Sequence, residues 1–262
     1  MKRNFRATPG IISFCFVVAL IWSSPLRSTH AASIGVNFGG ISNGTLGPSD
    51  IAGVLPYAQA NYNNVSAVAT GLTLNDNTGT ATTTTLTTTG ANSFSIFTAN
   101  PVAGPDEILN NSRANSTGTS WSFTLSGIPY ASYLLIVYDL QFATGAVVGI
   151  NAAGITYYTS SPTYNSAGYI DGNPATPFTY TQGTSTDPLA PTPLSDYVLF
   201  NNLSGSSVTV TITGGANATR MSGFQVVQIV PEPSAWAMLM LGGAGLLAAL
   251  RRPGRRVRWS SR

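Results

Sequence analysis

The amino-acid sequence predicts an all-β protein whose main part, residues 32–230, is an antiparallel β-sandwich. These residues are rich in Thr, Ser, Asn, Gly, Val and Tyr and contain no Lys and a single Glu, a composition that favours strands over helices. Short runs of alternating polar and apolar residues are separated by Gly, Asn, Pro or Asp, which is the pattern of a sandwich. The chain of 262 residues is long enough for one sizeable domain between two terminal segments.

Several strands can be placed from the apolar pattern. Residues 120–125 and 206–213 alternate between polar and apolar side chains, so each segment is expected to bury one face. Residues 133–142, reading YLLIVYDLQF, are more continuously apolar and predict a central strand. We expect further strands at residues 197–200 and 221–230, and one short helix or turn within residues 48–60.

A threonine-rich tract occupies residues 78–89, where nine of the twelve positions are Thr. Because Thr favours strands, we interpret the tract as a strand with a threonine-covered face. The alternative is a surface tract that carries O-linked sugar.

The N-terminal residues 1–31 have the organisation of a secretory signal peptide. A basic start, MKRNFR, is followed by an apolar stretch at residues 11–22 and by small residues before a cut. Thr29 and Ala31 occupy the two small-residue positions, which predicts cleavage after Ala31 by signal peptidase following export through the Sec machinery. The alternative is an uncleaved membrane anchor, but twelve apolar residues are short of the ~20 that a span needs.

The C-terminal residues 231–262 combine an apolar run with a basic end. Residues 235–250 carry no charge, and as a helix they would extend ~24 Å, close to the ~30 Å hydrocarbon core of a bilayer. Six arginines follow within residues 251–262, which argues against a buried core helix. They fit a cytoplasmic flank under the positive-inside rule, so we expect one transmembrane helix with residues 32–230 outside.

This tail resembles the PEP-CTERM sorting signal of Gram-negative bacteria. The likeness lies in Pro231-Glu232-Pro233, the apolar helix that follows, and the arginines from Arg251 onward. The resemblance implies recognition of Pro231, Glu232 and Pro233 by exosortase, a membrane cysteine protease, and release or transfer into the envelope or an exopolysaccharide matrix. Two prolines also fix an extended backbone, which suits a protease groove or, alternatively, a stiff spacer.

The main part of the chain is similar, more loosely, to β-sandwich domains that precede such tails. The opening SIGVNFGG and the closing stretch at residues 196–230 carry this likeness. Some of those domains resemble the galactose-binding-like jelly roll, so the resemblance implies a jelly-roll-like sandwich. A shared fold does not fix a function.

The distribution of charge and of reactive side chains excludes several classes of function. The basic residues lie mostly at the two ends, and in residues 32–230 eight acids against two arginines give a net charge of −6, so we expect no nucleic-acid partner. The one Cys and the one His, Cys15 and His30, lie in the leader. Catalysis by Ser-His-Asp or Cys-His groups and a zinc site of the usual kind are therefore not expected, and neither is an enzyme.

One stretch could form a binding face for sugar. Residues 155–180 contain six aromatic side chains interspersed with Asn and Asp. Aromatic faces stack on sugars, while Asp and Asn hydrogen-bond to hydroxyls, which makes Tyr164, Tyr169, Asp171 and Asn173 the candidate glycan-binding residues. The alternative, which we prefer, is that these are ordinary core and rim residues.

Calcium is a second candidate ligand. Asp50, Asp76, Asp171 and Asp187 sit near turn residues and could supply oxygen ligands for Ca²⁺. None follows the spacing of a known calcium loop, so we expect no cofactor. The adjacent pair Asp106-Glu107 is expected to be solvated, because neighbouring carboxylates rarely converge on one substrate atom.

Two functions remain after these exclusions. The preferred one is an exported, exosortase-sorted structural protein of the cell envelope or extracellular matrix that is not an enzyme. The alternative is a carbohydrate-binding module of the same fold that recognises an envelope or environmental polysaccharide. In both, residues 32–230 face outward and the C-terminus is cytoplasmic before processing.

Overall fold

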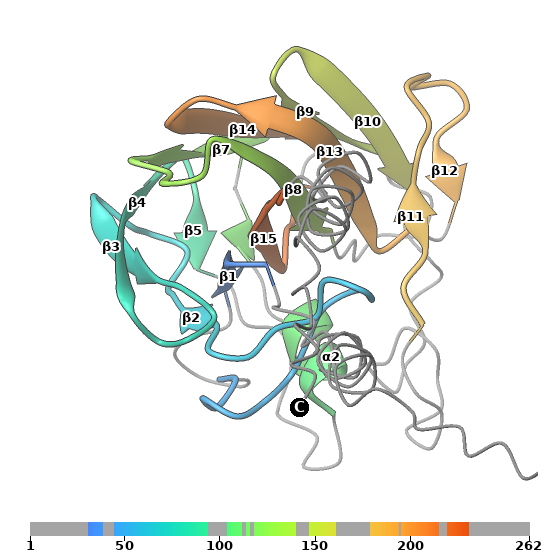
Figure 1. Ribbon diagram of the computed structural model, residues 1–262. Helices are drawn as coiled ribbons and strands as arrows, with labels where there is room; N and C mark the ends of the chain where they lie inside the picture. Colours follow the sequence, from blue (N-terminus) through green and yellow to red (C-terminus); the bar gives the residue numbers. More distant parts are fainter. Residues whose placement is uncertain are drawn as a thin grey trace, which may run out of the picture. The chain divides into compact units, whose positions relative to one another are not determined.

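The computed structural model of the chain is built mainly from β-strands, which form two mixed sheets and one small two-stranded sheet (Figure 1). It describes residues 31–38, 45–93, 104–111, 114–115, 118–139, 147–160, 179–193, 195–214 and 219–230. The chain divides into two compact units, residues 1–31 and 32–262, and all the elements below belong to the second.

The first sheet has six strands, and its central strands are antiparallel. Strand β8 pairs with β13 on one side and with β15 on the other, and β15 pairs with β1. The two short outer strands are parallel to their neighbours. In order across the sheet, the strands are β11 (Gln182–Gly183), β13 (Tyr197–Ser204), β8 (Ser132–Tyr138), β15 (Gly223–Gln228), β1 (Ser33–Asn37) and β2 (Asn63–Asn64).

The second sheet has seven strands and contributes the other side of the core. Its only parallel pair among the described residues is β10 with β12. In order, the strands are β12 (Thr192–Pro193), β10 (Ile155–Ser160), β9 (Val147–Ala152), β14 (Ser207–Gly214), β7 (Ser120–Ser126), β4 (Ala81–Thr89) and β3 (Leu72–Asn75). A two-stranded sheet, β5 (Asn92–Ser93) with β6 (Ala114–Asn115), and helix α2 (Pro105–Asn111) complete the elements.

A hydrophobic core lies between the two large sheets. Alternate side chains of β7 and β14 point into it, as the period of two in a strand requires. Phe123 of β7 stacks on Phe224 of β15, with ring centroids 4.6 Å apart and planes at 7°. Trp121 meets Phe38 edge-to-face, and its buried indole Nε1–H donates to the Thr219 carbonyl at 2.8 Å. This aromatic group joins the two sheets.

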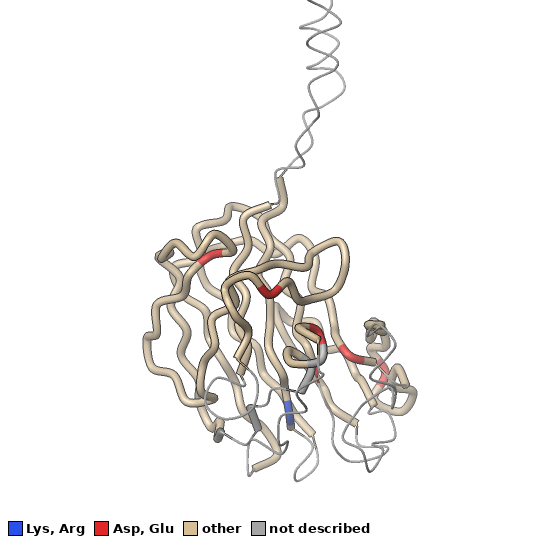
Figure 2. The backbone as a smooth tube through the Cα atoms, turned by 90° about the horizontal axis from the view of Figure 1, so that it is seen from below, with Lys and Arg blue, Asp and Glu red and all other residues tan. Residues whose placement is uncertain are grey.

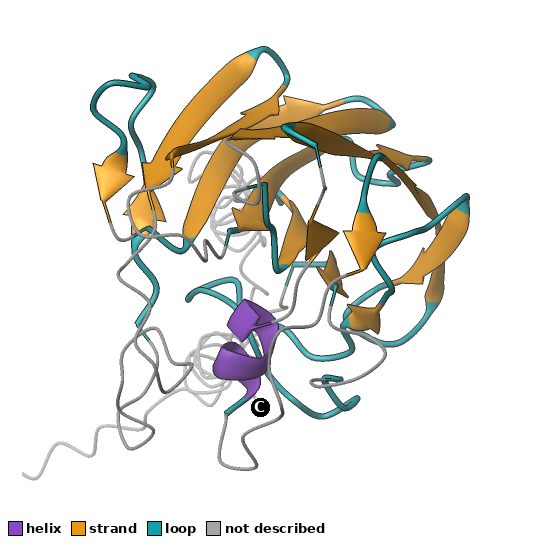
Figure 3. Cartoon of the chain, turned by 180° about the vertical axis from the view of Figure 1, so that it is seen from behind, coloured by secondary structure: helices purple, strands orange, loops and turns teal. Residues whose placement is uncertain are grey.

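A third layer covers the outer face of the six-stranded sheet. It consists of residues 45–62 and helix α2, which lies beside this sheet (Figures 1 and 3). A side chain added at Gly223 of β15 would meet Leu109 of α2 at 3.0 Å, so the helix packs closely on the sheet. Strand β8 is consequently buried on both faces, with Tyr133 and Leu135 toward the core and Leu134 and Ile136 toward the third layer.

The strands placed from the sequence are confirmed, and the sheet type needs a correction. Residues 120–126, 132–138, 197–204, 207–214 and 223–228 are strands, and β8 is an interior strand. The threonine tract forms β4, with Thr84 and Leu86 buried and the flanking threonines outside. The sheets are mixed rather than purely antiparallel, because short strands add in parallel at three edges. Residues 48–60 form turns, which was one of the two expected alternatives, and a short helix that was not predicted lies at 105–111.

The predicted terminal segments fall outside the described residues. These are the signal peptide at 1–31, apart from Ala31, and the sorting tail at 231–262 with its expected helix at 235–250. Within the part of the chain that the structure describes, no helix combines the length and the apolar character needed to cross a bilayer.

The aromatic stack between the sheets gives a first prediction. The Phe123→Ala substitution removes a fully buried ring and leaves a cavity, and it should lower the free energy of unfolding by about 3–5 kcal/mol. Ser126→Ala, on the exposed side of the same strand, should change it by less than about 0.5 kcal/mol. Urea unfolding followed by circular dichroism measures both, and equal losses in the two variants would contradict this core.

Candidate functional site

The structure separates the aromatic residues that the sequence grouped into one face. Tyr157 packs on Phe200 at 5.1 Å and belongs to the core, while Tyr158, the next residue of β10, points to the other side of the sheet. Tyr180 belongs to a separate cluster beside the six-stranded sheet. Ordinary core packing is therefore confirmed for Tyr157. The candidate residues Tyr164, Tyr169, Asp171 and Asn173 lie outside the described residues, as do Pro231, Glu232 and Pro233.

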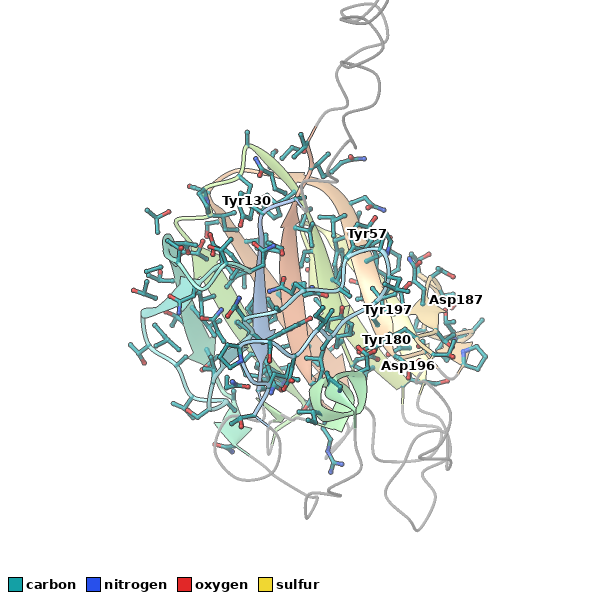
Figure 4. The ribbon with its side chains drawn as sticks, turned by 60° about the horizontal axis from the view of Figure 1, so that its bottom comes forward. Tyr57, Tyr130, Tyr180, Asp187, Asp196 and Tyr197 are labelled. Atoms are coloured by element: carbon teal, nitrogen blue, oxygen red, sulfur yellow. The ribbon has the colours of Figure 1, made fainter. Side chains whose placement is uncertain are left out.

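A tyrosine cluster lies between the six-stranded sheet and the third layer. We define it as Tyr62, Tyr138, Tyr180 and Tyr197. The ring of Tyr138 lies 5.4 Å from that of Tyr180 and 6.4 Å from that of Tyr197, and these two are 6.2 Å apart. Figure 4 shows Tyr180 and Tyr197 close to each other, with Asp196 beside them. The cluster brings together residues from four separate segments of the chain.

Hydrogen bonds from the cluster attach the third layer to the sheet. The Tyr138 hydroxyl donates to Gln225 Oε1 of β15 and accepts from the Val54 N–H at 3.0 Å. Within the third layer itself, the Tyr62 hydroxyl donates to the Ala52 carbonyl at 3.1 Å. The Gln225 amide in turn donates to the Tyr57 carbonyl at 2.9 Å. The buried polar groups are thus paired across the layer boundary, as burial requires.

Gly53 allows this close approach. Its φ of +108° is a conformation that side chains rarely adopt. A Cβ atom at this position would lie 2.5 Å from Gln225 Oε1 and 2.8 Å from the hydroxyl oxygens of Tyr138 and Tyr62. Glycine is therefore required here for both backbone conformation and space.

Asp106 at the start of α2 connects the helix to this network. Its Oδ1 accepts from the Gly53 N–H at 2.7 Å and from the Tyr180 hydroxyl at 3.0 Å. Burial raises the pKa of the Asp106 carboxyl, and these two hydrogen bonds oppose the rise only in part. The expectation that Asp106 is simply solvated was wrong, because the fold places it against residues 53 and 180.

The electrostatics of the cluster make its phenols hydrogen-bond donors. Burial raises the pKa of Tyr62, Tyr138 and Tyr180 well above the ordinary value of 10.0. The charge of Asp106 raises all three further. These hydroxyls are protonated at neutral pH, as an ordinary tyrosine is, and can donate hydrogen bonds that hold a neighbouring segment in place.

Two aspartates far apart in the sequence come into backbone contact at the end of β8. Asp139 and Asp196 are both buried, and the Asp139 N–H donates to the Asp196 carbonyl at 2.9 Å. The Asp139 carboxylate accepts from the Thr159 hydroxyl, and that of Asp196 accepts from the Thr181 N–H at 2.7 Å. The sequence analysis missed this pairing. Each residue flanks one of two strands, 132–138 and 197–204, that turn out to be neighbours.

The outer face of the seven-stranded sheet has a different chemistry. Cross-strand partners form four rows in which nearly every side chain carries a hydroxyl, and we call these residues the hydroxyl face. The rows are Thr85-Ser126-Ser207, Thr87-Thr124-Thr209, Thr89-Ser122-Thr211-Asn151-Thr156 and Ser120-Thr213-Gly149-Tyr158. Apart from Gly149, all are exposed or half-buried, and none is charged.

Within the hydroxyl face, neighbouring side chains support one another. The hydroxyls of Thr124 and Thr209 lie 2.9 Å apart, and the Asn151 amide donates to the Thr156 hydroxyl at 2.8 Å. The Tyr158 ring covers the space that Gly149 leaves, since a Cβ there would meet the ring at 3.1 Å. The result is an ordered, uncharged surface with one aromatic ring at its edge.

The described carboxylates do not assemble a metal centre. Among the residues that the structure places, no three His, Cys, Asp or Glu side chains are grouped to hold a metal ion. Asp76 instead accepts from the backbone N–H of Thr78 at 2.9 Å and of Thr80 at 3.1 Å, and Asp187 from that of Leu189 at 2.9 Å. These are turn contacts. Asp171 lies outside the described residues.

Comparison with known proteins gave no match to a family model, a curated protein or a solved structure. The resemblance of the C-terminal tail to the PEP-CTERM signal accordingly rests on its own motif.

The close approach at Gly53 gives a second prediction. Gly53→Ala should destabilise the protein by about 1–3 kcal/mol more than Gly154→Ala, because it adds a clash to the same backbone strain. Gly154 has a φ of +82°, and nothing lies within 4 Å of a Cβ built there. Urea unfolding compares the two variants. Equal destabilisation of Gly53→Ala and Gly154→Ala would mean that the third layer does not pack closely against the sheet at Gly53.

The shifted carboxyl of Asp106 gives a third prediction. Because the folded state holds this proton more tightly, its contribution to stability is present below the ordinary pKa of 3.8 and is lost as pH rises through the raised value. The stability of the Asp106→Asn variant relative to wild type should therefore increase over that window and then level off.

Asp76→Asn provides the control of opposite sign. Slight burial acts to raise the pKa of Asp76, but hydrogen bonds from Thr78 and Thr80 outweigh it and lower the pKa. The free energy of unfolding of wild type relative to this variant should therefore decrease on acidification, as pH falls through the lowered pKa of Asp76. Thermal unfolding between about pH 2 and pH 8 tests both, and a difference for Asp106→Asn that does not change with pH would contradict the assignment.

Proposed function

We propose that this chain is an exported structural protein, sorted through its C-terminal tail to the cell envelope or the extracellular matrix, and that it is not an enzyme. The observation that carries the proposal is the combination in residues 231–262 of Pro231-Glu232-Pro233, an uncharged stretch and an arginine-rich end. The leader at residues 1–31 supports the same topology independently, since it predicts export of everything that follows it.

The chemistry of residues 32–230 agrees with a structural role outside the cell. Arg220 is the only Lys or Arg among the described residues, and the few acids are scattered along the chain (Figure 2). The two sheets with their common core support the inference that this part is a jelly-roll-like sandwich. We infer that the Sec machinery exports the chain, that signal peptidase and an exosortase-type protease cleave it, and that the mature protein resides in exopolysaccharide.

A second candidate function is a carbohydrate-binding module of the same fold. The observation that favours it is the hydroxyl face, which is uncharged and carries the ring of Tyr158 at its edge. Hydroxyl groups beside an aromatic ring are the chemistry with which sugars are bound. The two functions are compatible, because a matrix protein can bind the polymer in which it is held.

Mass spectrometry of the mature protein tests the sorting proposal. We expect a chain that begins at Ala32 and lacks residues 251–262. The double substitution of Pro231 and Pro233 by Ala should leave residues 251–262 attached, because it removes the fixed extended backbone at the recognition element. Pro253→Ala, in the basic end, is the matched control and should be processed normally. Wild-type protein that keeps its arginines in the envelope would rule out processing.

A further inference from the structure

The hydroxyl face has a regularity that an ordinary solvated surface does not need. Its rows run across up to five neighbouring strands, from Thr89 of β4 to Thr156 of β10. Neighbouring strands lie ~4.8 Å apart, and side chains on one face of a strand repeat every ~6.8 Å. The longest row therefore extends roughly 19 Å across the sheet, and the four rows together extend roughly 20 Å along β7 and β14, which is larger than a single sugar.

The side chains of the hydroxyl face have few rotamers, and some of their hydrogen-bond donors and acceptors remain available to a ligand. Thr is β-branched and has few χ1 rotamers in a strand, so little side-chain entropy is lost when a ligand binds. A hydroxyl that donates one bond, as Thr213 does to the Gly149 carbonyl at 3.3 Å, still has lone pairs to accept another. The Asn151 amide, with one bond to Thr156, offers a further N–H and a carbonyl oxygen.

The outer faces of the two large sheets differ in how deeply their side chains are buried. The six-stranded sheet is covered by residues 45–62 and α2, and its outward residues Tyr138 and Gln225 are fully buried. On the hydroxyl face every side chain is exposed or half-buried. The outer face of the seven-stranded sheet is thus ordered, and its side chains are at least partly accessible to solvent.

The lack of charged residues on the hydroxyl face indicates which kind of partner it can bind. No position of the hydroxyl face is charged, and residues 32–230 together carry a net charge of −6. An acidic polymer would be repelled, and a basic partner would find no carboxylate on the face itself. A neutral chain with many hydroxyls matches both the absence of charge and the repeating donors and acceptors.

We propose that the hydroxyl face binds a neutral polysaccharide, with the ring of Tyr158 stacking on one sugar and the threonine rows contacting its neighbours. The proposal rests on the proposed function, since it names the surface through which an exported matrix protein holds its polymer. Tyr158 lies at one end of the row that runs through Gly149 and Thr213, so a chain along that row passes from the ring onto the hydroxyls.

Affinity electrophoresis of the full-length protein, prepared in a nonionic detergent, tests the proposal. The native gels contain hydroxyethylcellulose as the neutral polymer or alginate as the acidic one. We expect the neutral polymer to retard the wild type. The arginine-rich end of the full-length chain can bind alginate, so any retardation by alginate should be the same in the wild type and in the neutral face variants. Tyr158→Ala should weaken binding about tenfold, and Thr211→Val, which keeps the shape but loses the hydroxyl, about two- to tenfold.

Matched controls separate the face from the rest of the protein. Tyr57→Ala removes a half-buried tyrosine of the third layer, and Thr186→Val changes an exposed threonine in a loop, so both should bind like wild type. Tyr158→Leu keeps an apolar cover over Gly149, and its loss of binding would show that the ring acts by stacking rather than through folding. Unchanged circular dichroism is required of each variant.

A lysine on the face distinguishes the two kinds of polymer. Thr211→Lys should abolish retardation by hydroxyethylcellulose. The proposal is overturned if the face variants bind like wild type, if only alginate retards the protein, or if the face instead pairs two copies of the chain into a dimer that these variants break. The two proposals can fail separately. If the protein is processed and co-fractionates with the matrix but the face variants bind like wild type, the proposed function stands and the binding role of the hydroxyl face is ruled out.

Discussion

Strand β8 must be buried on both faces, and much of the architecture follows from this requirement. Its inner face is covered by the facing sheet, as in any two-layer β protein. Its outer face needs a third layer, which residues 45–62 and α2 provide. That layer is turn-rich and brings polar backbone groups over the sheet. The hydroxyl of Tyr138 and the amide of Gln225 are the partners that satisfy them, and Gly53 leaves the space that they need.

The sequence predicted those features that depend on local pattern. The nearly continuous apolar run around residues 133–138 indicated an interior strand, and the alternating runs at 120–126 and 207–214 indicated strands with one buried face. The parallel strands at the edges, such as β2 and β12, are two residues long and carry no such pattern. The pairing of Asp139 with Asp196 and the role of Asp106 depend on contacts between distant segments, which no local pattern encodes.

The candidate site shows the same division. An aromatic-rich stretch could be recognised from the sequence, but the period of two in β10 sends Tyr157 and Tyr158 to opposite sides of the sheet. Likewise, the threonine tract could be assigned to a strand, whereas the hydroxyl face appears only when the registers of five strands are known. A surface made of common residues can be recognised only from the register that places them side by side, and not from their residue types.

The short strands at the borders of both sheets have a consequence for solubility. An exposed sheet edge can pair with another molecule, and many proteins prevent this with lysines along the edge. The described part of this chain contains no Lys, but its border strands β2, β11 and β12 have two residues each and β3 has four, with an irregular register. Strands of this length offer too few backbone groups to template aggregation. Short border strands can therefore limit edge-to-edge association of the folded protein without lysines along the edge.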